Sequence, residues 1–288
     1  MSSRQSPVGT RVSEALPTVE AWADLLGSLS IPVLGNTAEV LERMRDDEDD
    51  MDAHSIAASV SSDPLMTLKI LVHAASHQSK KVVTDAETVT EALVMMGISP
   101  FFRAFGQQPT VERWLADEPA ALAAVRSTVR RAHRNANLAL AFAVQRMDPD
   151  AGTVHAVALM HEFAELLLWC HAPALQLRIA ALQTEDTTLR SKTAQERILN
   201  IDVQGLQIEL ARRWHLPSLL SQPDNSRHLE DAKVRTIDLA ARLARHMRRG
   251  WESDAVGADI DELATLLNLS TVAAKQLAQD ALTEIDGD

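Results

Sequence analysis

The stretch VHAVALMHEFAELLLWC, residues 154–170, is apolar on every side of a helix except at four polar positions, two of which are His161 and Glu162. Helices that are apolar all round pack on several neighbours in the middle of a domain. The sequence therefore predicts one central helix over residues 153–171. Because adjacent helical residues point about 100° apart, His161 and Glu162 can serve one site only if other elements bring partners to them.

The composition around this stretch favours helices throughout the chain. Of the 288 residues, 46% are hydrophobic, and there are only 10 Gly, 11 Pro and no Tyr. Leu and Ala dominate, which is typical of helices packed on helices. No segment alternates apolar and polar residues for long enough to indicate a strand. The sequence predicts an all-α protein that is large enough to bury a generous core.

Charge and targeting signals limit the partners and the compartment. The formal net charge is -12, so the chain as a whole repels nucleic acid and anionic lipid, and neither is an expected partner. The first residues lack the apolar core of a signal peptide, and no apolar run is long enough to span a membrane, which predicts a cytoplasmic protein. The single cysteine, Cys170, lies in the central stretch and is expected to be a buried, inert thiol.

Several helix ends are predicted from local chemistry. Asp63 can accept hydrogen bonds from free backbone N–H groups, and Pro64 suits the first helical position, so a helix is expected to begin there. The longest helix is expected from Pro119 to about Met147, with a buried stripe along one face. Two capping boxes are predicted to begin other helices: Thr84 with Glu87, and Asp259 with Glu262.

Four stretches together resemble the HDOD family, the HD-related output domain of bacterial signalling proteins. They are SIAASVSSDPLMTLKILVHAASH (55–77), TVTEALVMMGISPFF (88–102), AVALMHEFAELLLW (156–169) and ERILNIDVQGLQIELARRWHLP (196–217). The resemblance implies a multi-helix bundle related to HD-type metal-dependent phosphohydrolases, with an N-terminal helical lobe. It also implies an order of segments: a flexible tail (1–16), the HDOD domain (17–228, with a helical lobe to about 117 and an HD-like lobe from about 118), and C-terminal helices that pack on the HD-like lobe (229–288).

The enzymes that this family resembles hold metal with a histidine, an adjacent His-Asp pair and a distant aspartate. Carried onto this sequence, the first histidine falls on His133 and the pair on His161 and Glu162. The place of the distant aspartate is taken by Ala241, and Asp238, one turn earlier, is the only nearby substitute. The resemblance therefore implies a degenerate metal site with relic positions.

Two interpretations of these residues stay open at this stage. The favoured one is a module without catalytic residues, metal or cofactor, in which His133, His161 and Glu162 form a buried hydrogen-bonded cluster. The alternative is a surviving metal-dependent phosphohydrolase that uses these three residues and Asp238. The longer Glu162 side chain and the loss of an aspartate at Ala241 favour the first, because metal geometry is intolerant of such changes.

Arginine side chains suggest a different kind of site. Arg126, Arg130 and Arg134 share one face of the long helix, with Arg131 beside them, and could bind a phosphate-bearing ligand such as a nucleotide. A second stripe consists of Arg242, Arg245, Arg248 and Arg249. A solvated face paired with the many acids of the chain is the favoured interpretation, and nucleotide sensing is the alternative.

The sequence as a whole predicts a regulatory signalling module that acts by contact with another protein. No receiver, kinase or cyclic-dinucleotide-synthesising motif is recognisable, so the input is expected from a separate partner, for which a second copy of the chain is an alternative. The contact surface is expected between the helical lobe and the HD-like lobe. The C-terminal stretch ELATLLNLSTVAAKQLAQDAL (262–282) has the outline of a helix-turn-helix but is acidic, which predicts a packing corner instead of a DNA reader.

Overall fold

The computed structural model describes residues 11–77, 86–221, 232–247 and 250–283. Across these residues the chain forms helices joined by short connections, and an isolated parallel bridge joins Val33 and Thr110. The predicted all-α fold is confirmed. None of the helices in these ranges is both long and apolar enough to cross a membrane.

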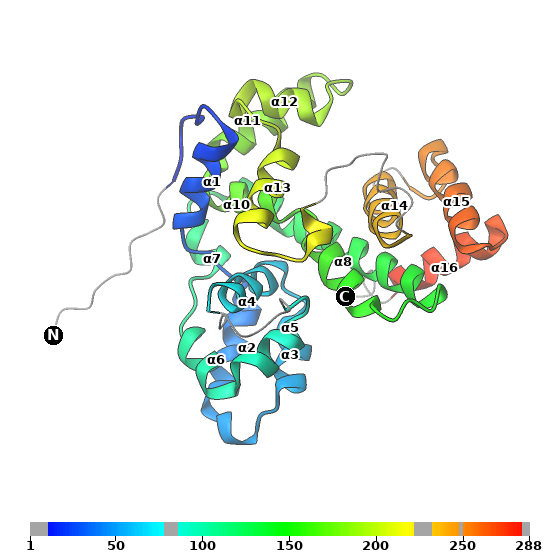
Figure 1. Ribbon diagram of the computed structural model, residues 1–288. Coiled ribbons are helices and arrows are strands. Elements are labelled where there is room, and N and C mark those ends of the chain that lie inside the picture. The colour runs from blue at the N-terminus through cyan, green and yellow to red at the C-terminus, as the bar shows by residue number, and fades with distance from the viewer. Residues whose placement is uncertain (1–10, 78–85, 222–231, 248–249, 284–288) are drawn as a thin grey trace.

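One end of the molecule is built from short helices that follow one another in the chain (Figure 1). They are α2 (Gly35–Asp46), η1 (Glu48–Asp50), α3 (Ala53–Val60), α4 (Pro64–Ser76), α5 (Val89–Met96) and α6 (Ile98–Ala104). Within this lobe α3 packs on α2 and α5, and α4 packs on α5. The short α7 (Val111–Trp114) leads into the second half of the chain.

The first helix lies apart from this lobe. Helix α1 (Val19–Ser28) packs on α13 (Val203–Arg213), which is far away in the sequence. Its fully buried Trp22 donates a hydrogen bond through Nε1 to the carbonyl of Leu199, at 3.1 Å. The N-terminal segment of the chain therefore bridges to the second half and does not simply extend the lobe that follows it.

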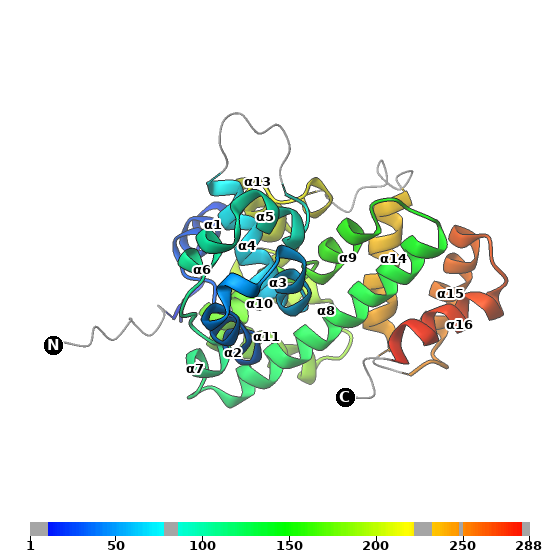
Figure 2. The ribbon, with the colours of Figure 1, turned by 90° about the horizontal axis from the view of Figure 1, so that it is seen from below.

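The second half is organised around the longest helix, α8 (Pro119–Gln145), which crosses the whole molecule (Figure 2). Helices α9 (Ala151–Leu159), α10 (Phe163–His171) and α11 (Pro173–Glu185) all contact it. The series continues with α12 (Ser191–Leu199), α13 and η2 (Ser218–Leu220). The buried stripe of α8 is confirmed at Val125, Val129, Ala132 and Ala136, but Val144 at its end is 60% exposed.

The predicted single central helix is wrong, because it is broken into α9 and α10 by a turn at residues 160–162. The backbone N–H of Phe163 bonds the carbonyl of Met160 at 3.0 Å in this turn. No Gly or Pro marks the break in the sequence. Its cause is tertiary: α9 packs on α8 and α14 (Ala232–His246), whereas α10 packs on α8, α13 and α4, so the two halves follow different neighbours. The turn places His161 and Glu162 at a corner.

Helix starts were predicted with mixed success. Asp63 caps α4 through the N–H groups of Leu65 and Met66, as expected. Helix α5 begins after Thr88, whose side chain accepts from the N–H of Glu91, and the capping box predicted at Thr84 lies outside the described residues. The capping box at Asp259 is wrong, because α15 (Asp254–Leu267) begins after Ser253 and carries Asp259 in its buried interior.

The described part of the predicted tail, residues 11–16, contacts the body of the protein. Arg11 forms an ion pair with Asp117 and donates to the carbonyl of Trp114 at 2.8 Å. The N–H of Val12 bonds the carbonyl of His171 at 2.7 Å. These contacts tie the segment before α1 to the ends of α7 and α10, and residues 1–10 lie outside the described residues.

Two of the three last helices lie against the far end of α8, and the third packs on those two (Figure 2). Helix α14 (Ala232–His246) packs on α8 and α9, α15 packs on α14, and α16 (Thr271–Thr283) packs on α15 and α8. Arg146 at the end of α8 donates to the carbonyl of Ala232 and to Thr236, both at 2.9 Å. Ala274, Ala278 and Leu282 of α16 are buried, as a packing corner requires.

Candidate functional site

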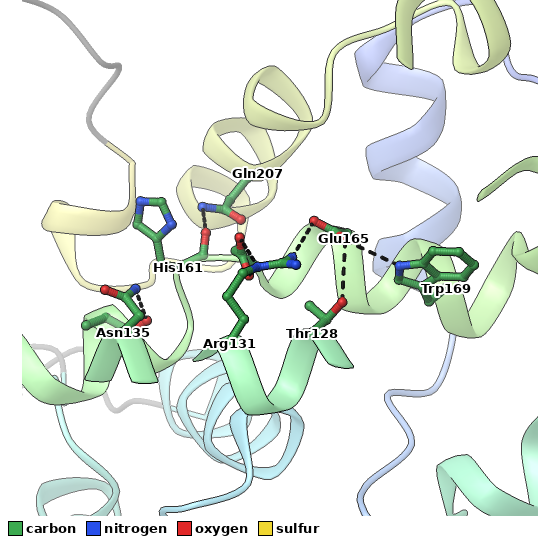
Figure 3. A network of polar contacts seen from close by, with 9 residues as sticks. Thr128, Arg131, Asn135, His161, Glu165, Trp169 and Gln207 are labelled. Carbon is green, nitrogen blue, oxygen red and sulfur yellow. Dashed lines mark hydrogen bonds and ion pairs between the residues drawn. The ribbon is translucent and has the colours of Figure 1, made fainter. Parts of the chain in front are cut away.

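An arginine from α8 binds two carboxylates at the α9–α10 turn, where relic metal ligands were predicted (Figure 3). The Nε of Arg131 lies 2.8 and 2.6 Å from the two carboxylate oxygens of Glu162. An Nη of the same guanidinium lies 3.1 Å from Glu165, one turn further along α10. All three side chains are less than a third exposed, so these are desolvated, charge-assisted hydrogen bonds of the stronger kind.

Neutral side chains hold this cluster in place from three directions. Glu165 also accepts from the hydroxyl of Thr128 on α8 and from the indole of Trp169 on α10, both at the long distance of 3.4 Å. Asn135 on α8 donates to the carbonyl of Ala158 at 2.7 Å, and Gln207 on α13 donates to the carbonyl of His161 at 2.6 Å. The turn is thus fixed on both sides of Glu162 (Figure 3), and its carboxylate points at Arg131.

The charges of the cluster compensate one another in part. Burial raises the pKa of Glu162, and the nearby Glu165 raises it further, while Arg131 and the more distant Arg245 oppose the rise. Burial alone would lower the pKa of Arg131, but Glu165 and Glu162 outweigh it and the net shift is upward. The guanidinium therefore stays charged and attracts both acids, which would otherwise repel each other, although its single positive charge balances only one of the two carboxylates.

The predicted cluster of His133, His161 and Glu162 takes a different form. His133 donates through Nε2 to the carbonyl of Ser62 at 2.6 Å, which links α8 to the connection before α4. The ring of His161 points away from Arg131 (Figure 3). Glu162 has Arg131 as its hydrogen-bond partner, so a His–Glu cluster is replaced by an Arg–Glu–Glu cluster. His155 on α9 lies near His133, and burial and that neighbour lower its pKa.

Asp238, the suggested substitute for the distant aspartate, pairs with Arg242 on its own helix at 3.7 Å. Ala241 is buried. In the part of the chain that the structure describes, no three His, Cys, Asp or Glu side chains converge as ligands of one metal ion. Two of the four expected donors are bound to arginine and one to a backbone carbonyl, so these residues do not fit a divalent metal in this arrangement.

The arginines of the two predicted stripes have different environments in the structure. Arg126 and Arg130 are exposed on α8, while the neighbouring Arg131 turns into the acidic cluster. In the second stripe Arg242 pairs with Glu262 and Asp259 of α15, and Arg248 and Arg249 lie outside the described residues. Arg131 is therefore the site residue that the sequence did not single out. The pattern that indicates its role is the spacing of polar residues by three and four along α8, through Thr128, Arg131 and Asn135.

The end of α10 carries two buried ionisable groups that take no part in the cluster. Cys170 is a free, buried thiol, as predicted, and burial raises its pKa to about 12, so it stays protonated and unreactive. His171 is 1% exposed, with Trp114 packed edge-on at 5.4 Å between ring centroids. Burial lowers its pKa to about 4, against which a hydrogen bond with the Ser30 backbone acts. His171 is thus neutral in the folded protein.

This histidine predicts an acid-dependent loss of stability. The pKa falls from 6.5 in the unfolded chain to about 4 in the fold, so below pH 6.5 the unfolded chain binds a proton that the folded chain rejects. Stability contributed by neutral His171 is therefore lost as the pH falls from 6.5 towards 4, by about 2 kcal/mol between pH 7 and pH 5. Urea unfolding of the wild type and His171→Phe across this range is expected to give a shallower pH slope in the variant, and equal slopes would contradict the assignment.

Comparisons with known proteins agree with this architecture. The chain matches the solved structure of the MmoQ response regulator from Methylococcus capsulatus with a TM-score of 0.62 and 17% identity, over 86% of this chain and 98% of that one. A virulence factor from Campylobacter jejuni matches with a TM-score of 0.60 and 15% identity, over 93% and 98%. No curated protein matches. The model of the HDOD domain matches residues 31–229, most of the chain, and the protein therefore belongs to the HDOD family.

Proposed function

We propose that the protein is a non-catalytic signalling module of a bacterial cytoplasm, which acts by contact with another protein. The observation that carries this proposal is the pairing of Glu162 with Arg131. In the related enzymes the equivalent acid serves a metal, whereas here its two oxygens are occupied by an internal cation. The relic site instead holds α8 against the α9–α10 turn.

Two further observations support the proposal. Two of the three remaining donors of the expected metal set, His133 and Asp238, are engaged with Ser62 and Arg242. One similar structure is called a response regulator, a name that places that protein in a signalling pathway. A module of this kind needs a binding surface and a defined shape, but it needs no reacting group. The Arg131 cluster contributes to the defined shape, because it fixes the packing of α8 on α10.

The absence of catalysis is tested directly. Untagged protein is incubated with Mn²⁺, Fe²⁺, Zn²⁺ or Mg²⁺ and with a generic phosphodiester or cyclic dinucleotides. The expected result is no turnover above the protein-free blank and no difference between the wild type and His161→Ala. Metal-dependent turnover that disappears in a folded His161→Ala variant would contradict the proposal and establish the phosphohydrolase alternative.

Protein contact is tested by photo-crosslinking in cells from exposed apolar positions. Val94 on α5, Met147 after α8 and Val272 on α16 are 70, 88 and 80% exposed and lie on three separate elements. A photoreactive residue is placed at each position in turn. A discrete adduct is expected from a position that lies in the contact surface, and no adduct from a position outside it. Mass spectrometry then distinguishes a second copy of the chain from a different protein. Three positions without any adduct would count against contact signalling.

A further inference from the structure

Two histidines lie one helical turn apart at the end of α4, far in the sequence from the Arg131 cluster. The rings of His73 and His77 stack with their centroids 4.0 Å apart and their planes inclined by 26°. Phe105 packs edge-on against His73, with 5.0 Å between the ring centroids. His73 is partly buried and His77 is exposed, so the pair is held on one side and open to solvent on the other.

Hydrogen bonds define which ring nitrogen of His77 is free to act as a ligand. Its Nδ1 lies 2.9 Å from the carbonyl oxygen of His73 and 2.9 Å from the hydroxyl of Ser76. A carbonyl oxygen only accepts, so Nδ1 carries the proton and Nε2 keeps its lone pair. A backbone carbonyl that fixes the tautomer in this way is the usual outer partner of a metal-bound histidine.

We propose that His73 and His77 form a two-histidine binding site for a divalent transition-metal ion at the C-terminal end of α4. Histidines at positions i and i+4 share one helix face, and this spacing is used for zinc in helical motifs. Two imidazole nitrogens at about 2.0–2.1 Å from a tetrahedral ion lie roughly 3.3 Å apart. In the metal-free structure the two rings are stacked, with their planes inclined by 26°. Metal binding turns the rings out of this stack about their side-chain bonds, so that the in-plane lone pairs of both Nε2 atoms point at the ion, and water completes the coordination.

The surroundings favour a cation at this position. The free carbonyl groups at the end of a helix carry partial negative charge, which stabilises a positive ion there. Imidazole pairs suit copper, nickel and zinc, with copper bound most tightly. This site is independent of the proposed function, because it shares no residue with the Arg131 cluster.

The test is metal binding by untagged, chelator-treated protein. Zn²⁺ is added in isothermal titration calorimetry, and thermal unfolding is followed at increasing Zn²⁺ concentration. We expect one equivalent bound with micromolar affinity and a Tm that rises with the Zn²⁺ concentration. His73→Gln and His77→Gln are each expected to weaken binding at least tenfold, because a chelate needs both rings. The matched control, His54→Gln, changes an exposed histidine on α3 and is expected to bind Zn²⁺ like the wild type.

The variants also separate this site from the relic metal site. Unfolding of each variant without metal verifies that the fold is retained. Binding that survives in His161→Ala but is lost in His73→Gln supports the proposal. Binding that survives in both His73→Gln and His77→Gln, or no binding by the wild type, overturns it. Binding lost only in His161→Ala would overturn it as well, and would at the same time contradict the non-catalytic function.

Discussion

Arg131→Met is expected to lower the free energy of unfolding by about 3 kcal/mol, because it leaves two partly buried carboxylates without their cation. Arg131, Glu162 and Glu165 are 17, 21 and 29% exposed, so water replaces the lost hydrogen bonds only in part. Methionine keeps most of the volume of the arginine stem, which limits the loss of packing. The measured cost therefore reports on charge and hydrogen bonding.

Urea unfolding at pH 7 measures this cost against matched variants. Arg126→Met removes an exposed arginine from the same helix and is expected to change stability by less than about 0.5 kcal/mol. Adding Glu162→Gln to Arg131→Met is expected to recover part of the lost free energy of unfolding, because a neutral amide beside Glu165 destabilises the fold less than a second carboxylate does. Equal costs for Arg131→Met and Arg126→Met would show that the cluster does not hold α8 to α10.

Features set by neighbouring residues were predictable from the sequence. The Asp63–Pro64 start of α4 and the Pro119 start of α8 each depend on a few adjacent residues. The burial of Cys170 followed from the apolar character of its own segment. The family resemblance, carried by four separate stretches, gave the bundle fold that the family match confirms. Local chemistry and overall composition sufficed for these features.

Features set by tertiary contacts were not predictable. The break at residues 160–162 comes from the different neighbours of α9 and α10, and apolar periodicity carries no information on it. The sequence is compatible with a histidine or an arginine as the partner of Glu162, and only the approach of α8 in the fold selects Arg131. Asp259 resembled a helix cap, but in the fold it bonds His246 at 2.7 Å and Arg242 at 3.2 Å. In each case the partner is distant in the sequence.

Asp63→Ala is expected to cost about 4 kcal/mol, the largest effect among these substitutions. Asp63 is 1% exposed. One of its oxygens accepts from the N–H groups of Leu65 and Met66, at 2.8 and 3.1 Å, and the other accepts from Leu34 at 2.7 Å. The substitution removes the cap of α4, worth about 1–2 kcal/mol. It also leaves the N–H of Leu34, at the start of α2, without its acceptor, at a further cost of about 1–3 kcal/mol.

Asp52 provides a control with the same capping geometry at an exposed position. It accepts from the N–H groups of His54 and Ser55 at 2.8 and 2.9 Å and caps α3 only. Asp52→Ala is therefore expected to cost about 1 kcal/mol. Asp63→Asn, which keeps one carbonyl oxygen, is expected to lie between the two alanine variants. Urea unfolding of the three proteins measures the order, and equal costs at Asp52 and Asp63 would mean that the bond to Leu34 does not tie α2 to α4.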